Sequence, residues 1–436
     1  MAVTPLIAIV GRPNVGKSSL FNRLVGVRQA ITHETAGTTR DANYGALTWN
    51  KKHFILVDTA GIHRADGELD LAVQDQVKEV AKLADIIVVV VDAGNIITDE
   101  DREAATLALK TRKPVILVTN KIDTVRAGKA DSFERLGVKE IIETSAIHGS
   151  GSGDLLDAVA SQIAEDTAPA EKEDVITLAF LGRPNVGKSS LYNSLVGKQQ
   201  AIVSQIAGTT RDIGSTDLKY HGQTIRLLDT AGLRRRGKIE AGVEKYSSLR
   251  TLAAVAQADI CVVVIDATEL SVAGDQHIAG LAAEAGKGII LVVNKWDLIE
   301  RDDKTQARYT RRLVSDFAFI HWAPLVYTSA IQGLNVARLF ELTRQIAETR
   351  RITIPTGKLN SLIEKMVAKQ PPAGLKGRQP KIKYATQTGT NPPTFRIFAS
   401  YPSLVHFSYQ RYLENGLRDA YEFIGTPIKL EFKAKS

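Results

Sequence analysis

Short runs of apolar, largely β-branched residues alternate with longer helix-like stretches along most of the chain. This alternation is typical of α/β domains, in which a mainly parallel sheet is flanked by helices. The runs predicted as strands in the first part are Leu6–Val10, Phe54–Val57, Ile86–Val91, Val115–Thr119 and Glu140–Glu143. Those in the following part are Ile176–Leu181, Ile225–Leu228, Ile260–Ile265, Ile289–Val293 and Pro324–Tyr327. The pattern therefore predicts two α/β domains in tandem.

Sequence motifs repeat between the two predicted domains. Gly11–Ser18, which reads Gly-Arg-Pro-Asn-Val-Gly-Lys-Ser, recurs letter for letter as Gly182–Ser189. Further motifs of the first copy are Ala36–Asp41, Asp58–Gly61, Asn120–Asp123 and Thr144–Ala146, which recur as Ala207–Asp212, Asp229–Gly232, Asn294–Asp297 and Thr328–Ala330. A repeat of this length indicates duplication of a whole domain, since a solenoid has a much shorter period. The motifs lie at or just beyond the C-terminal ends of predicted strands, where open α/β sheets bind ligands.

The motif Gly-x-x-x-x-Gly-Lys-Ser after a strand is a phosphate loop. Its glycines let backbone N–H groups converge on phosphate oxygens, and the helix that starts near Lys17 directs its positive end at them. Lys17 and Lys188 are predicted to act in catalysis by contacting the β- and γ-phosphates. Ser18 and Ser189 are predicted to bind Mg²⁺ through their hydroxyls.

The motif Asn-Lys-x-Asp at a strand end predicts guanine as the base. A carboxylate from Asp123 or Asp297 would accept hydrogen bonds from guanine N1–H and the N2 amino group. Adenine lacks both donors and would leave a buried charge unpaired. Thr-Ser-Ala at the last strand end would offer a backbone N–H to guanine O6. GTP is therefore favoured over ATP.

Asp58 and Asp229 are expected to hold magnesium through water, while the N–H groups of Gly61 and Gly232 sense the γ-phosphate. The second threonine of each Gly-Thr-Thr motif is the expected direct magnesium ligand, and the alternative is a turn built from Gly and Thr. These threonines, Thr39 and Thr210, complete the predicted catalytic set.

An aliphatic residue follows Asp-Thr-Ala-Gly in both copies, namely Ile62 and Leu233. In Ras-like switches a glutamine at this place orients the attacking water. Since an aliphatic side chain does not orient water, we expect slow intrinsic GTP hydrolysis. Leu233 also begins the arginine-rich run Leu233–Lys238, which is either a solvated loop or a surface that docks RNA or another domain.

The residues expected to bind GTP come from the same motifs in both copies. In the first copy they are Gly11, Arg12, Pro13, Asn14, Val15, Gly16, Lys17, Ser18, Asp58, Thr59, Ala60, Gly61, Ile62, Asn120, Lys121, Ile122, Asp123, Ser145 and Ala146. In the second copy they are Gly182, Arg183, Pro184, Asn185, Val186, Gly187, Lys188, Ser189, Asp229, Thr230, Ala231, Gly232, Leu233, Asn294, Lys295, Trp296, Asp297, Ser329 and Ala330.

The hydrophobic pattern changes after residue 352. The predicted elements there are a helix at Lys358–Lys369, strands at Lys381–Thr386 and Thr394–Phe398, a helix at Tyr409–Phe423 and a strand at Ile428–Phe432. The segment has 13 Lys and Arg against 5 Asp and Glu, so it carries the whole net charge of +8. This charge fits contact with a polyanion, or a surface kept basic for solubility. Ten of the 26 aromatic residues lie here, for base stacking or for the core of a small domain.

The doubled phosphate loop, the Gly-Thr-Thr-Arg-Asp motif, the aliphatic residue after Asp-Thr-Ala-Gly and the basic third domain together resemble a bacterial family of tandem GTPases, Der or EngA. Like the TrmE and Era GTPases, this family lacks the catalytic glutamine. The resemblance covers essentially the whole chain. It implies a GTPase that acts late in assembly of the large (50S) ribosomal subunit, with rRNA and ribosomal proteins as partners.

The same resemblance implies a KH-like C-terminal domain and a potassium ion near the phosphates. Related GTPases without the glutamine hold this ion partly through the phosphate-loop asparagine, which is Asn14 or Asn185 here. KH domains clamp RNA with a Gly-x-x-Gly loop between two helices, whereas Gly374–Gly377 joins a helix to a strand. We interpret it as a basic loop, with phosphate contacts through Lys376, Arg378, Lys381 and Lys383 left open.

These predictions divide the chain into a GTPase domain at 1–164, a linker at 165–174, a second GTPase domain at 175–352 and a KH-like basic domain at 353–436. The only cysteine, Cys261, excludes an intramolecular disulfide. No signal segment or membrane-length apolar run is present, so we expect a cytoplasmic protein without a membrane anchor. We also expect a monomer. Alternative functions are a GTPase linked to RNA modification and a signalling switch that binds protein effectors only.

Overall fold

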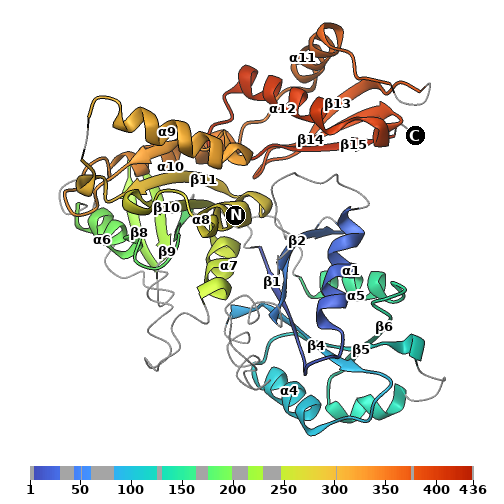
Figure 1. The fold of residues 1–436 in the computed structure, drawn as a ribbon. Helices are drawn as coiled ribbons and strands as arrows, with labels where there is room; N and C mark the ends of the chain where they lie inside the picture. The colour runs from blue at the N-terminus through green and yellow to red at the C-terminus, as the bar shows by residue number, and fades with distance from the viewer. Residues whose placement is uncertain are drawn as a thin grey trace. The chain divides into compact units, whose positions relative to one another are not determined.

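The computed structural model describes residues 4–29, 44–50, 52–59, 83–124, 130–163, 175–198, 215–228, 247–300, 302–374 and 378–434. The chain divides into two compact units, one around the N-terminal sheet and one containing the second sheet together with the C-terminal domain (Figure 1). The predicted linker 165–174 lies outside the described residues, and the predicted domain boundaries stay predictions. None of the described helices has the length and hydropathy of a membrane-spanning segment.

The N-terminal sheet has six strands in the order β2-β3-β1-β4-β5-β6. Its elements are β1 (Leu6–Val10), α1 (Lys17–Gln29), β2 (Tyr44–Trp49), β3 (Lys52–Asp58), β4 (Ile86–Asp92), α4 (Asp99–Lys110), β5 (Val115–Asn120), β6 (Glu140–Thr144) and α5 (Ser152–Gln162). Short 3₁₀ turns, η1 (Ile122–Thr124) and η2 (Ala130–Leu136), follow β5. All strand pairs are parallel except β2 with β3.

The second sheet repeats this topology in the order β12-β11-β10-β7-β9-β8. The elements of this part of the chain are β7 (Val175–Leu181), α6 (Lys188–Lys198), β8 (Ser215–Tyr220), β9 (Gln223–Leu228), α7 (Ser247–Gln257), β10 (Ile260–Asp266), α8 (Ala273–Glu284), β11 (Gly288–Asn294), α9 (Thr305–Asp316), β12 (Leu325–Tyr327) and α10 (Arg338–Arg350). The described residues of this part also include the 3₁₀ turns η5 (Ala267–Glu269), η6 (Trp296–Leu298) and η7 (Ala318–Ile320). The fold prediction of two tandem α/β domains is confirmed.

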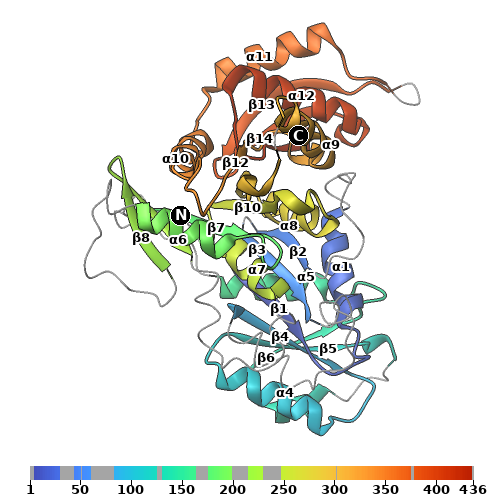
Figure 2. The same cartoon turned by 60° about the vertical axis from the view of Figure 1, so that its left-hand side comes forward.

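The hydrophobic pattern misses two strands, β2 and β8. Each lies at the edge of its sheet, as Figure 2 shows for β8, and each pairs antiparallel with the next strand. Their sequences, Tyr-Gly-Ala-Leu-Thr-Trp and Ser-Thr-Asp-Leu-Lys-Tyr, mix polar and apolar residues because an edge strand is only partly buried. Neither strand carries a predicted ligand-binding residue.

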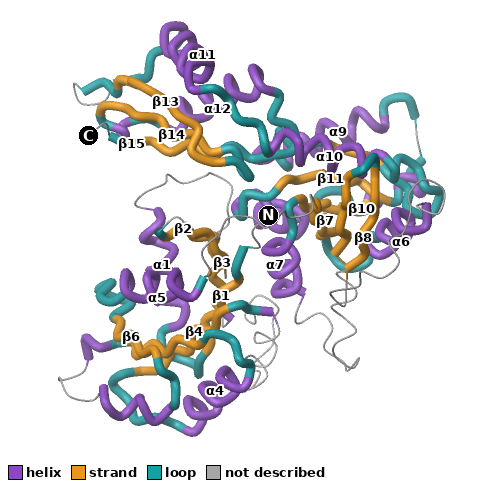
Figure 3. The backbone as a smooth tube through the Cα atoms, turned by 180° about the vertical axis from the view of Figure 1, so that it is seen from behind, coloured by secondary structure: helices purple, strands orange, loops and turns teal. Residues whose placement is uncertain are grey.

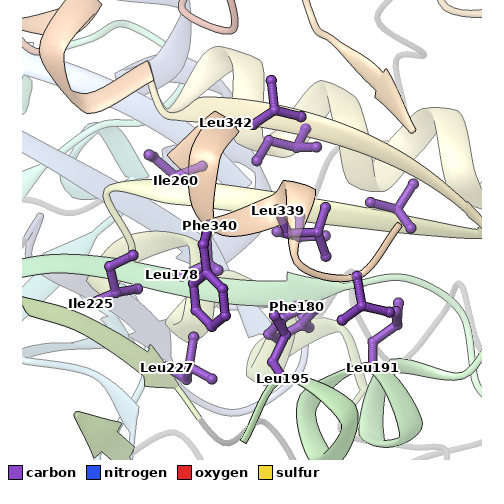
Figure 4. Close-up of a cluster of buried hydrophobic side chains, with 14 of the residues drawn as sticks. Leu178, Phe180, Leu191, Leu195, Ile225, Leu227, Ile260, Leu339, Phe340 and Leu342 are labelled. Carbon is purple, nitrogen blue, oxygen red and sulfur yellow. The ribbon is translucent and has the colours of Figure 1, made fainter. Parts of the chain in front are cut away.

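Helices on both faces bury the central strands of each sheet. Every residue of β4 and β10 is buried, which explains their unbroken apolar sequences. In the second domain, side chains from the sheet, α6 and α10 form one cluster, in which Phe180 and Phe340 lie among leucines and isoleucines (Figure 4). These packed sheets hold the carboxyl ends of their strands in fixed positions, and the predicted motifs follow those ends.

The C-terminal domain has the predicted α-β-β-α-β order. Its elements are α11 (Thr356–Lys369), β13 (Lys381–Gly389), β14 (Thr394–Ser400), the 3₁₀ turn η8 (Pro402–Leu404), α12 (Phe407–Tyr421) and β15 (Lys429–Lys433). β14 lies in the middle of the sheet, antiparallel to β13 and parallel to β15. Figure 3 shows α11 and α12 on one side of this sheet. Gly374 follows α11 and precedes β13, so the Gly-x-x-Gly motif joins a helix to a strand as predicted.

A buried contact joins the C-terminal domain to the domain of the second sheet. The Arg350 side chain is 3% exposed and donates hydrogen bonds to the Gly286 carbonyl at 2.9 Å and to Thr426 Oγ1 at 3.1 Å. The backbone N–H of Ile289 donates to the Gly425 carbonyl at 2.9 Å. The bonds to Thr426 and Gly425 cross from one domain to the other, and the bond to Gly286 holds the Arg350 side chain in place, so the two domains pack as parts of one unit.

Candidate functional site

The first phosphate loop lies between β1 and α1, and its lysine is folded back over the loop. Lys17 Nζ donates to the carbonyls of Gly11 at 2.7 Å and Arg12 at 2.8 Å. In the second domain Lys188 Nζ donates in the same way to Gly182 at 2.7 Å and Arg183 at 2.6 Å. The identical sequences therefore form identical loops, with one ammonium group held inside each.

Two glycines allow a close approach between the phosphate loop and an asparagine. Gly16 has φ +93°, and a Cβ there would lie 2.3 Å from Asn120 Nδ2. Gly187 has φ +98°, and a Cβ there would lie 2.1 Å from Asn294 Nδ2. Any side chain at these positions would clash with the asparagine and strain the backbone, so the motif requires glycine.

Asn120 joins three of the predicted motifs through its side-chain amide. Its Nδ2 donates to the Val15 carbonyl at 2.9 Å, and its Oδ1 accepts from Thr144 Oγ1 at 3.2 Å and from the Ala146 N–H at 3.1 Å. The residue is 1% exposed. The sequence placed Asn120 among GTP-binding residues, and the structure gives its amide a positioning role between phosphate loop and base-reading loop.

Asn294 makes the corresponding contacts in the second domain. It donates to the Val186 carbonyl at 3.0 Å and accepts from Thr328 Oγ1 at 3.2 Å and the Ala330 N–H at 3.1 Å. The same three motifs therefore converge in both copies.

The base-reading carboxylate of the first domain is held by a serine. Asp123 lies in η1, and Ser145 Oγ donates to its Oδ1 at 2.5 Å. This hydrogen bond lowers the pKa of Asp123, and it outweighs the opposing effect of desolvation. Asp123 is exposed, as a residue that contacts a bound base must be. The carboxylate is therefore ionised and oriented before any base binds.

The second base-reading loop is held by aromatic packing instead. Trp296, at the place of Ile122, is 4% exposed, and its ring centroid lies 5.0 Å from that of Tyr309 and 4.4 Å from that of Tyr327. Tyr309 belongs to α9, a helix in the longer second copy. The neighbouring Asp297 therefore follows a buried side chain that packs on two other rings.

The lysine of each base-reading motif contacts an acid that the sequence analysis missed. Lys121 Nζ lies 2.7 Å from both the Asn14 carbonyl and Asp92 Oδ2, and Lys295 Nζ lies 2.5 Å from Asp266 Oδ2. Burial alone would raise the pKa of Asp92, but its bonds to Lys121 and to the Gly94 N–H lower it overall. Asp92 and Asp266 are the last residues of β4 and β10. Their equivalent positions in the two copies are the sequence feature that could have identified them as site residues.

The arginine of each phosphate loop points away from the loop backbone toward the first turn of a helix. Arg12 Nε lies 3.2 Å from Asp101 Oδ1 in α4, and Arg183 Nε lies 3.0 Å from Asp275 Oδ1 in α8. Because both side chains are engaged in ion pairs, we expect Arg12 and Arg183 to contact nucleotide through their backbone only.

Only some of the predicted magnesium ligands lie within the described residues. Ser18 and Ser189 are exposed in the first turns of α1 and α6. Asp58 ends β3 beside Ile9 of β1, and its neighbour Thr59 donates from Oγ1 to the Ile9 carbonyl at 2.8 Å. Hydroxyl and carboxylate oxygens are the donors that Mg²⁺ prefers, so Ser18 and Asp58 fit this ion.

Several predicted site residues lie outside the described part of the chain. They are Thr39, Ala60, Gly61 and Ile62 of the first copy and Thr210, Asp229, Thr230, Ala231, Gly232 and Leu233 of the second. The run Leu233–Lys238 and Lys376 also lie outside it. Their predicted roles stay predictions.

The predicted potassium ligands, Asn14 and Asn185, are exposed on the phosphate loops. Both have left-handed backbone conformations, with φ +66° and φ +65°. An asparagine adopts this conformation more readily than most residues, which suits the sharp bend before Val15 and Val186.

Two phosphate loops, each tied by an asparagine to an Asn-Lys-x-Asp loop, define a tandem P-loop GTPase. A family model described as "50S ribosome-binding GTPase" matches residues 6–121 and 177–295. A second, described as "KH-domain-like of EngA bacterial GTPase enzymes, C-terminal", matches residues 353–433. The prediction of a KH-like third domain is thus confirmed.

Close relatives carry one family name. The chain is 45% identical over 440 residues to GTPase Der of Chloroflexus aggregans, covering 99% of this chain and 98% of that protein. It is 44% identical over 427 residues to GTPase Der of Geobacillus thermodenitrificans, covering 98% of both. The G domain of the T. maritima FeoB iron transporter aligns with a TM-score of 0.28 at 25% identity, over 36% of this chain and 98% of that one. The chain belongs to the GTPase Der family, and it binds and hydrolyses GTP.

Proposed function

We propose that the protein is a GTP-driven switch that acts in late assembly of the large (50S) ribosomal subunit. The observation that carries this proposal is the presence, on one chain, of two GTPase domains matched by a ribosome-binding GTPase model and a basic KH-like domain. The positive charge of the C-terminal segment complements rRNA phosphates. The chain would bind a ribosomal precursor in one nucleotide state and leave it after hydrolysis.

The chemistry of each site follows from its residues. Lys17 and Lys188 would contact the β- and γ-phosphates, and Asp123 and Asp297 would read guanine. Mg²⁺ would be held by the hydroxyls of Ser18, Thr39, Ser189 and Thr210, and it would neutralise charge on the phosphates. With Ile62 and Leu233 in place of a glutamine, intrinsic hydrolysis would be slow.

A monovalent cation would supply part of the missing stabilisation. K⁺ beside Asn14 or Asn185 would add positive charge where negative charge develops during phosphoryl transfer, as an arginine finger does. The exposure of both asparagines supports this role, because the ion must reach them from solvent.

Co-sedimentation tests the ribosomal role. Full-length protein is centrifuged with purified large-subunit precursors at several salt concentrations, with GDP or with a non-hydrolysable GTP analogue. We expect more protein in the subunit fraction with the GTP analogue, and a steep loss with salt because phosphate contacts release counterions. Absence of any nucleotide-dependent association would sink the proposal.

Two other functions remain as alternatives. A GTPase linked to RNA modification would associate with tRNA instead of large subunits, and a signalling switch would associate with neither RNA nor ribosomes. The same experiment with tRNA and with protein-only fractions separates these outcomes. We further propose a monomer, which mass measurement in solution tests directly.

A further inference from the structure

The sheet of the C-terminal domain has two chemically different faces. Phe395, Ile397 and Ala399 of β14 are fully buried in the core formed with α11 and α12. Because side chains alternate along a strand, Arg396 and Phe398 point to the opposite face. We call this opposite face the open face of the sheet.

Two aromatic rings lie together on the open face. Tyr384 of β13 pairs with Phe398 of β14 in the antiparallel register, and their ring centroids are 6.1 Å apart with an interplanar angle of 37°. Tyr384 is 42% exposed and Phe398 is half-buried. A small domain normally buries such rings, as this one does with Tyr409 and Phe423, so an exposed pair on a sheet needs another explanation.

Cations surround these rings. A register shift between Ile382 and Tyr384 leaves Lys381 opposite Ser400, and hence on the same face as Phe398. On the other side, Lys433 of β15 pairs with Phe398, and both Lys381 and Lys433 are exposed. The aromatic pair therefore has one exposed lysine next to it along β13 and another across the sheet on β15.

The remaining charges on the open face are an ion pair and a lysine. Arg396 Nη2 lies 3.0 Å from Glu431 Oε2, and its side chain is still 40% exposed. Lys429 lies opposite Thr394, with its Nζ 4.0 Å from Glu431 Oε1. Glu431 is thus the single acid among four cations on the paired positions of this face, which leaves it positively charged.

We propose that the open face binds single-stranded RNA. Tyr384 and Phe398 stack on unpaired bases, while Lys381 and Lys433 contact the phosphates on either side. A duplex would present phosphates to the lysines but would keep its bases stacked away from the rings. The proposal rests on the proposed ribosomal role for the identity of the polymer, and it places recognition on the sheet instead of the Gly374–Gly377 loop.

Fluorescence anisotropy tests the proposal with the full chain. The probes are a fluorescein-labelled oligoadenylate, whose bases are unpaired, and an RNA duplex of equal length. We expect the wild-type chain to prefer the single strand. Tyr384→Ala is expected to weaken single-strand binding roughly tenfold, because one stacked base is lost, while Tyr384→Phe retains wild-type affinity.

A matched pair of charge variants separates RNA contacts on the open face from the general attraction between a basic domain and RNA. Lys381→Ala/Lys433→Ala removes two charges from the open face, and Lys365→Ala/Lys369→Ala removes two exposed charges from α11. We expect the first variant to weaken single-strand binding more than the second at equal salt. Equal losses from the two variants, wild-type affinity in Tyr384→Ala, or equal binding of duplex and single strand would overturn the proposal.

The wild-type chain and Tyr384→Ala also test RNA binding by the open face separately from the ribosomal role. Oligoadenylate binding that depends on Tyr384, without nucleotide-dependent co-sedimentation with large subunits, would support the open face and contradict the ribosomal role. Co-sedimentation with unchanged oligoadenylate binding in Tyr384→Ala would do the reverse. Circular dichroism of the variants checks folding, which an exposed tyrosine is not expected to determine.

Discussion

The side-chain amide of Asn120 donates to the backbone carbonyl of Val15 at 2.9 Å, and so ties the base-reading strand end to the phosphate loop. Asn294 repeats this bond with Val186 at 3.0 Å. One buried side chain in each domain therefore sets the distance between the part that binds phosphates and the part that reads the base.

Replacing either asparagine is expected to abolish GDP binding at one of the two nucleotide sites. Asn120→Ala or Asn294→Ala leaves a buried carbonyl and a buried N–H unpaired, at a cost of about 1–3 kcal/mol for each group. The number of GDP molecules bound per chain, measured by equilibrium dialysis at moderate GDP concentration, should fall by one in each variant. Unchanged stoichiometry and affinity in both would contradict the positioning role.

Trp296 is expected to stabilise the second nucleotide site. Trp296→Ile introduces the residue found at the equivalent Ile122 and removes the packing on Tyr309 and Tyr327, at a cost of about 2–3 kcal/mol. GDP should dissociate faster from the second site, as followed with a fluorescent GDP analogue. Trp296→Phe keeps an aromatic ring and should show a smaller change; equal rates in all three proteins would argue against this role.

Gly425 is expected to control the contact between the C-terminal domain and the second GTPase domain. Its φ is +65°, and a Cβ there would lie 2.3 Å from Ile346 Cδ1. Gly425→Ala therefore adds a clash of about 1–3 kcal/mol to the backbone strain. Gly222→Ala is the matched control, since Gly222 has φ +80° with no atom within 4 Å of the added Cβ. Thermal unfolding should show a larger loss for Gly425→Ala than for the control.

A buried lysine predicts an unusual pH dependence of stability. Burial lowers the pKa of Lys287 from 10.5 to about 8. Between these values the unfolded chain holds a proton that the folded chain has lost, so stability rises with pH. The rise should approach about 1 kcal/mol between pH 8 and pH 9.

Cys261 has the opposite effect on stability at higher pH, so the effect of Lys287 is best measured up to pH 9. Burial raises the pKa of its thiol from 9.0 to about 12, so the folded chain holds the proton longer and stability falls above pH 9. Urea unfolding of wild type and Lys287→Met at pH 8 and pH 9 provides the measurement. The stability gain with pH should be lost in Lys287→Met, and an identical gain in both proteins would exclude Lys287 as its source.

Potassium should accelerate GTP hydrolysis relative to sodium. We expect a difference of about tenfold in the wild type, and a smaller difference in Asn14→Ala and in Asn185→Ala, because each removes one ligand. Phosphate release at equal ionic strength measures the rates, and GDP affinity serves as the control for intact sites. Equal rates in the two salts for all three proteins would end the cation proposal.

The central strands and the phosphate loops were predictable from the sequence. Strands such as β4 and β10 are buried along their whole length, so their apolar sequences identify them. The loop Gly11–Ser18 carries its chemistry in consecutive residues. The edge strands β2 and β8 were not predicted, because their residues face different surroundings and share no strong pattern.

Contacts between segments far apart in the sequence were not predictable. Asp92 meets Lys121 only because β4 and β5 are neighbours in the sheet, and a carboxylate at a strand end has no distinctive sequence signal. The aromatic pair Tyr384 and Phe398 depends on the register of β13 and β14 in the same way. The number of aromatic residues did not decide between core packing and base stacking. Only the strand register separates the aromatic residues of the core from the pair on the open face.

The buried Arg350 contact has a consequence for how the protein is divided. A cut at the predicted boundary after residue 352 would leave the Arg350 guanidinium without Thr426 and the Ile289 N–H without the Gly425 carbonyl. A fragment ending there would expose to solvent the Arg350 side chain, which keeps its bond to the Gly286 carbonyl, and the Ile289 N–H of β11. A gene segment that encodes the second GTPase domain with these contacts intact therefore has to extend through residue 426 and the C-terminal domain that contains it.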